Sequence, residues 1–192
     1  MSRAVDALKK GELVVYPTDN LYALGADVFN ESAVKKVFTV KNRPFDMPLS
    51  VAVSGVEAIN RIAFVDDRVK ILVDGFLPGC LSLVLKKRDV LPGVVTGGLD
   101  KVAVRIPDNV FALSLLDVFG PLTVTSANVH GEKTMDSVKD VEKQLKSELV
   151  SLYVDSGVLS SRPSTIVDIT LEEPVILRKG EISLQEILKV LK

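Results

Sequence analysis

The chain has 192 residues, of which 47% are hydrophobic, and its 24 Lys and Arg residues stand against 25 Asp and Glu residues. This length suits one large hydrophobic core, so we expect a single domain spanning 1–192. The nearly balanced charge excludes the broad cationic field of a dedicated nucleic-acid binder, and no apolar run approaches the roughly 20 residues that a membrane-spanning helix needs.

Periodicity and turn residues divide the chain into alternating helices and strands, with a polar loop at 18–25 and a glycine-rich crossing at 92–98. Helices are predicted at 5–9, 31–40, 55–61, 67–76, 109–118, 137–145 and 184–191. Strands are predicted at 13–16, 49–53, 81–86, 102–106, 122–125, 149–154, 164–169 and 174–177. Because several late strands follow one another without a helix, we expect an α/β fold with a mixed β-sheet and flanking helices. The N-terminal residues lack the apolar region of a secretory signal, which predicts a cytoplasmic protein.

The first polar signature, Lys41-Asn42-Arg43-Pro44, follows the helix predicted at 31–40. Pro44 disfavours helical backbone at Arg43, so we predict an extended segment on which the Lys41 and Arg43 side chains face one anion. Arginine offers a planar fork and lysine a movable point charge, a combination suited to several phosphate groups. The alternative is a solvated helix end that binds no ligand.

One cysteine and one histidine limit the catalytic chemistry of the chain. Cys80 stands at the start of a predicted strand and is expected to be an ordinary buried or half-buried thiol. His130 lies in a turn and is expected to be a solvated loop residue. An internal disulfide, the common zinc patterns and a Ser-His-Asp triad are therefore excluded.

The second polar signature, Ser126-Ala127-Asn128, follows the strand predicted at 122–125. Hydroxyl and amide groups in such a turn can hold a ribose, a phosphate or an amino acid, and the small Ala127 leaves room for a ligand near the backbone. A plain turn, in which the polar side chains bond their own backbone, is the alternative.

Further cations stand at strand ends and in short basic runs. Arg105 and Arg178 each end an apolar strand, and together with the Lys41 and Arg43 pair they can converge on one concave face. The runs Lys35-Lys36 and Lys86-Lys87-Arg88 offer local RNA contacts, although solvated charge at element ends is the favoured interpretation. Neither GxxxxGK[S/T] nor GxGxxG occurs, so a phosphate site must be built in another way.

Seven segments carry a common pattern in order along the chain. They are YPTDNLYALG at 16–25, KNRP at 41–44 with PL at 48–49, PG at 78–79, VAVRIP at 102–107, TSAN at 125–128, PSTIVD at 163–168 and LRKG at 177–180. In this order and over nearly the whole chain, they resemble the YrdC-like threonylcarbamoyl-AMP synthases. The extra C-terminal domain of longer members is missing, so we expect the short, single-domain form.

The resemblance implies an open twisted mixed sheet with a positively charged concave cavity. It also implies a nucleotidyltransferase that joins L-threonine, bicarbonate and ATP into threonylcarbamoyl-AMP and releases pyrophosphate. The product supplies a downstream threonylcarbamoyl transferase complex that modifies adenosine 37 of tRNA. Mg²⁺ is expected with the nucleotide, held mainly by phosphates and water, so no protein metal site is expected.

The family's functional residues, carried over by position, fall into two groups. The ATP-binding group is expected to be Lys41, Arg43, Ser126, Asn128 and Arg178, and Lys41 and Arg43 are also the expected catalytic residues. The amino-acid-binding group is expected to be Asn20, Arg105, Thr125 and Ser164. Displacement at phosphorus needs positioning and charge neutralisation more than a protein nucleophile, which agrees with the lack of a catalytic Cys or His.

Three positions depart from the family pattern. Asn20 stands where the family has the last threonine of PTDT, Ala52 stands where a histidine is common, and the loop at 131–135 reads GEKTM. An amide can replace a hydroxyl as a hydrogen-bonding group, whereas a methyl group cannot replace an imidazole. These departures support a second hypothesis, a non-catalytic or differently specific paralogue that binds RNA or a nucleotide.

Overall fold

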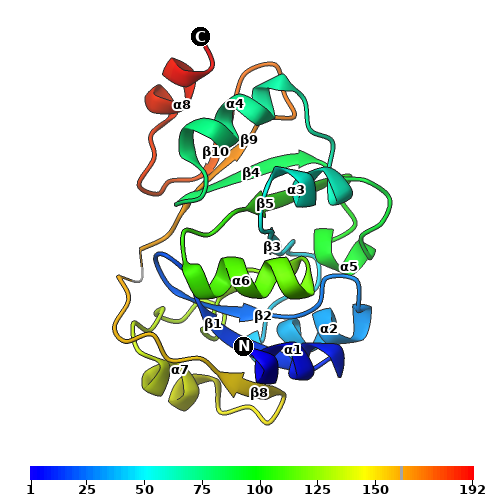
Figure 1. Cartoon of the computed structure of the whole chain (residues 1–192), viewed down its shortest axis with the longest axis vertical. Coiled ribbons are helices and arrows are strands. Elements are labelled where there is room, and N and C mark those ends of the chain that lie inside the picture. The colour runs from blue at the N-terminus through cyan, green and yellow to red at the C-terminus, as the bar shows by residue number, and fades with distance from the viewer. Residues whose placement is uncertain (161) are drawn as a thin grey trace.

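The computed structural model describes residues 1–160 and 162–192 as a mixed α/β protein (Figure 1). Its helices are α1 (Ser2–Lys9), α2 (Glu31–Lys41), α3 (Val56–Ile62), α4 (Asp67–Phe76), α5 (Gly93–Thr96), α6 (Val110–Phe119), α7 (Val138–Leu145) and α8 (Leu184–Val190). Seven of them were predicted from periodicity, and α5 is a short addition within the glycine-rich crossing. No helix in the described residues has both the length and the apolar composition needed to cross a membrane.

Helix starts follow the capping rules closely. The side chains of Asn30, Asp66, Asn109, Ser137 and Ser183 each accept a hydrogen bond from a backbone N–H in the first turn of the helix that follows. Such caps satisfy one of the donors that a helix start leaves free. Asn109 is therefore the cap of α6.

The strands form two open sheets, which lie in the lower and upper halves of Figure 1. The strands are β1 (Leu13–Pro17), β2 (Tyr22–Gly25), β3 (Ser50–Ala52), β4 (Leu81–Lys86), β5 (Lys101–Arg105), β6 (Leu122–Thr123), β7 (Thr125–Ser126), β8 (Val150–Tyr153), β9 (Thr165–Asp168) and β10 (Val175–Arg178). The four-stranded sheet has the order β7-β2-β1-β8, and the six-stranded sheet has the order β10-β9-β4-β5-β3-β6. Both sheets contain parallel and antiparallel pairs, which confirms the mixed α/β class.

The division into two sheets differs from the single sheet that we predicted, and it results from one segment. The strand predicted at 122–125 is interrupted at Val124: β6 pairs with β3 in one sheet, and β7 pairs with β2 in the other. The Thr123 hydroxyl donates to the Leu24 carbonyl at 3.0 Å and accepts from the Ala26 N–H at 2.9 Å. Two sheets therefore meet at the point where the Ser126-Ala127-Asn128 turn begins.

The N-terminal strand is buried on both faces, as its continuous apolar run predicts. Leu13 and Val15 pack in a core cluster with α2, α3 and α4, while Val14 and Tyr16 pack in a second cluster with α1 and α6. The stretch at 18–25 is not the loop that we predicted. Thr18 to Leu21 form a tight turn, and β2 returns antiparallel to β1.

Candidate active site

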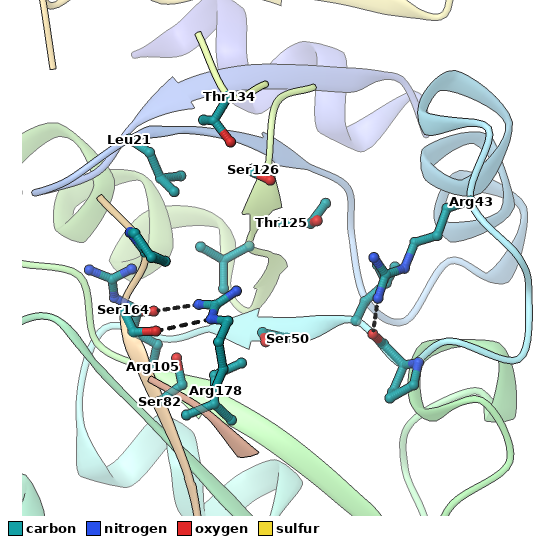
Figure 2. Close-up of a pocket in the computed structure, with 15 residues that line it drawn as sticks. Leu21, Arg43, Ser50, Ser82, Arg105, Thr125, Ser126, Thr134, Ser164 and Arg178 are labelled. Atoms are coloured by element: carbon teal, nitrogen blue, oxygen red, sulfur yellow. Dashed lines mark hydrogen bonds between the residues drawn. The ribbon is translucent and has the colours of Figure 1, made fainter. Parts of the chain in front are cut away.

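A cavity of about 300 Å³ lies between the two sheets (Figure 2). The four-stranded sheet and its loops contribute one wall, and strands β3, β4, β5, β9 and β10 contribute the other. The lining residues are Leu21, Arg43, Pro48, Leu49, Ser50, Ser82, Arg105, Val124, Thr125, Ser126, Thr134, Pro163, Ser164, Ile166 and Arg178. Three of them are arginines, and none of the described lining residues is a carboxylate.

Arg43 reaches the cavity from the end of α2. The helix continues through Lys41, and Asn42 then adopts left-handed backbone at φ 49° and ψ 44°. This helix end contradicts the extended segment that we predicted for Lys41 to Arg43. Asparagine tolerates the left-handed conformation better than most residues, which explains the sharp helix stop. The Arg43 guanidinium donates to the Pro48 carbonyl at 2.9 Å, and burial lowers its pKa.

The Lys41 ammonium reaches the Ser126-Ala127-Asn128 turn. It donates to the Ser126 carbonyl, to the Asn128 carbonyl at 2.7 Å and to Asn128 Oδ1 at 3.3 Å. The side chain is buried and does not line the cavity. The structure therefore separates the two cations of the first signature and joins the first signature to the second through Lys41.

A titration of Lys41 is expected to appear in the stability of the protein. Burial, and secondly the charge of Arg43, lower the pKa of Lys41 from 10.5 to about 7. Between these two values the unfolded chain binds a proton at Lys41 that the folded chain does not, so the free energy of unfolding rises with pH. Denaturant titrations of wild type and Lys41→Met should show that this rise is smaller in the variant. Lys35→Met, at an exposed position of the same helix, is the matched control. An equal pH slope in wild type and Lys41→Met would contradict the assignment.

The Ser126-Ala127-Asn128 turn is internally bonded as well as anchored to Lys41. The Ser126 hydroxyl donates to Asn128 Oδ1, and the Asn128 amide donates to the carbonyls of Val129 and Glu132, each at 2.8 Å. Ser126 and the neighbouring Thr125 line the cavity, whereas the Asn128 side chain holds the loop that follows. Asn128 therefore behaves as the plain-turn alternative predicts, because its side chain bonds backbone. Ser126, in contrast, forms part of the cavity wall.

Arg105 is buried on the floor of the cavity and makes several hydrogen bonds. Its guanidinium donates to Asp19 Oδ2 at 2.6 Å, to Asn20 Oδ1 at 3.1 Å and to the Gly79 carbonyl at 3.0 Å. Asn20, itself 1% exposed, donates to the Arg162 carbonyl and does not line the cavity. The structure therefore places Asn20 behind Arg105, as a residue that orients the guanidinium.

Cys80 also contacts this ion pair. Its Sγ donates to Asp19 Oδ2 at 3.0 Å and lies 3.7 Å from the Arg105 guanidinium. Burial and the hydrogen bond to Asp19 raise the pKa of the thiol to about 12. The thiol is therefore protonated at neutral pH, which agrees with the non-catalytic role that we predicted.

Arg178 and Ser164 meet where the last strand of the sheet reaches the cavity. The Arg178 guanidinium donates to the Ser164 carbonyl at 3.0 Å and to the Ser164 hydroxyl at 2.9 Å (Figure 2). Beyond the strand, Gly180 approaches the backbone of Pro163 to Thr165, and the Thr165 hydroxyl donates to the Ile182 carbonyl at 2.7 Å. These contacts hold the LRKG and PSTIVD segments together.

Gly180→Ala is expected to disturb this contact. A Cβ at position 180 would lie 2.3 Å from the Thr165 nitrogen and 2.4 Å from the Ser164 carbonyl carbon, so backbone must move. We expect the free energy of unfolding to fall by about 1–3 kcal/mol, as for other overpacked sites, in a urea titration. Gly93→Ala is the control, because a Cβ there meets nothing within 4 Å. Equal stability of the two variants would refute the tight contact.

Most predicted site residues line the cavity, and some lining residues were not predicted. Arg43, Arg105, Thr125, Ser126, Ser164 and Arg178 line it, whereas Lys41, Asn20 and Asn128 stand behind lining residues. Sequence reasoning missed Ser50, Ser82 and Thr134. Ser82 carried a usable signal, because it is the only hydroxyl within an otherwise apolar strand, 81–85.

The geometry adds no support for RNA contacts by the basic runs or for a bound Mg²⁺ ion. Lys35 pairs with Glu31, Lys87 pairs with Asp89, and Arg88 bonds Asn60, which is typical of solvated charges at element ends. Among the described residues, no group of three or more His, Cys, Asp or Glu side chains is arranged to hold a metal ion.

The sequence is similar to a known protein family and to several of its members. The family model described as telomere recombination, which names Sua5, YciO and YrdC, matches residues 6–180. The threonylcarbamoyl-AMP synthase of Pyrococcus abyssi is 36% identical over 190 residues, which are 98% of this chain and 56% of the relative. A putative threonylcarbamoyl-AMP synthase of Methanocaldococcus jannaschii is also 36% identical, over 96% of this chain and 89% of the relative. The chain thus spans little more than half of the Pyrococcus relative and most of the Methanocaldococcus one.

A solved structure supports the same relationship. The crystal structure of Pyrococcus abyssi Sua5 complexed with L-threonine superimposes with a TM-score of 0.92 and 37% sequence identity. The superposition covers 97% of this chain and 56% of the Sua5 chain. The likeness therefore extends over nearly all of the segments that form the two sheets.

Proposed function

The chain belongs to the Sua5/YciO/YrdC family, and we propose that it is a threonylcarbamoyl-AMP synthase, which condenses L-threonine, bicarbonate and ATP and releases pyrophosphate. The observation that carries the proposal is the likeness, at a TM-score of 0.92, to a family member crystallised with L-threonine. The cavity supports it, because its three arginines suit a reaction between anionic substrates.

The chemistry requires positioning and charge neutralisation. The amine of the amino acid attacks the carbon of bicarbonate, and water leaves as the carbamate forms. One carbamate oxygen then attacks the α-phosphorus of ATP, and pyrophosphate leaves on the opposite side. Negative charge accumulates on the phosphoryl oxygens as these bonds change. Fixed donors aimed at that charge stabilise the transition state without reorganising, so this nucleotidyltransferase needs no nucleophilic side chain.

We assign the residues by their place around the cavity. Arg43 and Arg178 approach from opposite sides and neutralise the triphosphate, while Arg105 binds the carboxylate of the amino acid. Thr125 and Ser126 line the wall between them and offer hydroxyls to the substrates. Lys41 and Asn128 contribute indirectly by fixing the turn that carries Ser126.

Mg²⁺ enters the proposal as a companion of ATP. The described lining residues include no carboxylate, and phosphate oxygens and water would coordinate the ion when it is bound with the nucleotide. The product leaves for a threonylcarbamoyl transferase complex acting on tRNA in the cytoplasm. Direct RNA contact by this chain stays a prediction.

Specificity for the amino-acid substrate depends on the residues around the cavity. Ala52 is fully buried in a core cluster with Leu122, and the Asn20 amide is engaged by Arg105, so neither supplies a free polar group to the cavity. Specificity for threonine then depends on Arg105, Thr125 and the surrounding hydroxyls.

The experiment incubates the protein with ATP, Mg²⁺, labelled bicarbonate and one amino acid at a time. We expect pyrophosphate and a labelled adenylate with L-threonine, and less of both with serine, valine or alanine. Absence of both products with threonine refutes the proposed function. Equal product with all four amino acids keeps the reaction but refutes threonine specificity.

A further inference from the structure

The Ser82 hydroxyl is a buried polar group in the lining of the cavity. Its residue is 2% exposed and lines the cavity, and it makes no side-chain hydrogen bond to any residue in 1–160 or 162–192. Buried hydroxyls are nearly always hydrogen-bonded in folded proteins, and one that faces a cavity can bond either water or a ligand held there.

Strand register places Ser82 between two arginines. Arg178 of β10 pairs with Ile166 of β9, and Ile166 pairs with Ser82 of β4. The antiparallel β4–β5 pair aligns Leu83 with Val104, which brings Ser82 opposite Arg105. Side chains at paired positions lie on the same face of a sheet. Figure 2 shows Ser82, Arg105 and Arg178 together on the cavity floor.

The charges around this row favour an anion. Burial, and secondly the charge of Arg105, lower the pKa of Arg178, which indicates that the two guanidiniums are close enough to repel each other. Asp19 compensates Arg105, whereas Arg178 has no carboxylate partner among the described residues. A bound oxyanion would relieve the repulsion, and a hydroxyl between two cations can donate to the same anion without adding charge.

We propose that Ser82 is a further ligand-binding residue, whose hydroxyl donates a hydrogen bond to an oxyanion bound between Arg105 and Arg178. The oxyanion is a carboxylate, a bicarbonate or a phosphoryl group, which present the same acceptor chemistry. This inference rests on the proposed function and deepens it by adding a third donor to the cavity floor.

Direct binding measurements on Ser82→Ala test the inference. Calorimetric titrations with L-threonine, bicarbonate and pyrophosphate, each alone, should show that the variant binds one of the three anions about 10- to 100-fold more weakly, the range for hydrogen bonds to charged groups. The affected anion identifies the source of the oxyanion. Ser82→Cys, whose thiol is a weak donor, should fall between wild type and Ser82→Ala. Ser151→Ala, at an exposed position of β8, is the control.

Stability separates a binding role from a structural one. Because the hydroxyl has no partner among the residues that the structure describes, Ser82→Ala should unfold at the same denaturant concentration as wild type or at a higher one. A destabilised Ser82→Ala, unchanged affinity for all three anions, or a wild type that binds none of them overturns the inference. Turnover is measured separately: Ser82-dependent anion binding without pyrophosphate release would refute the proposed function and leave the subsite standing.

Discussion

Arg105→Leu is expected to lower the free energy of unfolding by about 3–5 kcal/mol, because it leaves the Asp19 carboxylate without its partner. The Arg105 and Asp19 side chains are 3% and 13% exposed, and an Arg105 guanidinium nitrogen lies 2.6 Å from Asp19 Oδ2. Asn20, Gly79 and Cys80 also lose the hydrogen bonds that the guanidinium donates to them. Chemical denaturation followed by circular dichroism measures the change.

A double variant distinguishes the ion pair from the loss of packing. Asp19→Asn combined with Arg105→Leu removes both charges, so it should be more stable than Arg105→Leu alone. The double variant should nevertheless fail to make the adenylate, because the guanidinium proposed for the amino-acid carboxylate is gone. A cost below about 1 kcal/mol for Arg105→Leu would show that the pair contributes little.

Arg43→Ala is expected to reduce kcat/KM for pyrophosphate release by about 100- to 1,000-fold, the loss typical of one well-placed donor to a developing charge. Within the described part of the chain, the side chain donates only to the backbone carbonyls of Met47 and Pro48, so stability should change little. Arg43→Lys should recover part of the activity, since it restores the charge without the planar fork.

The control for Arg43 is Arg61→Ala, which removes an exposed arginine at the end of α3, away from the cavity. Steady-state kinetics with ATP as the varied substrate should separate a rise in KM from a fall in kcat. Full activity in Arg43→Ala would remove this residue from the site.

Local patterns predicted most elements of the fold, because helix periods and caps depend on neighbouring residues. Pairing between distant strands was not predictable in the same way. Tyr22 to Gly25 reads as the end of a polar loop, and only its register with β1 makes it a strand. The change of sheet at Val124 likewise depends on β2 and β3, which lie about 100 and 70 residues earlier in the chain.

The candidate site shows the same limit. The sequence indicated the arginines, but Asp19 lies 86 positions from Arg105, and nothing local links them. Asn42 was a readable helix stop, since asparagine commonly ends helices in left-handed backbone, yet the proline after Arg43 suggested an extended segment instead. The cavity-facing side of β4, and hence the position of Ser82, follows from strand pairing alone.

The late completion of both sheets affects how the chain can fold during synthesis. Strand β1 pairs with β8, and β4 pairs with β9, so both pairings need strands from the last third of the chain. Until these strands have left the ribosome, each sheet keeps an unpaired apolar edge. Folding dominated by such distant contacts is slow, and unpaired edges invite association between nascent chains. Translation that stalls before position 165 would therefore yield a fragment with unpaired strand edges that is prone to aggregate.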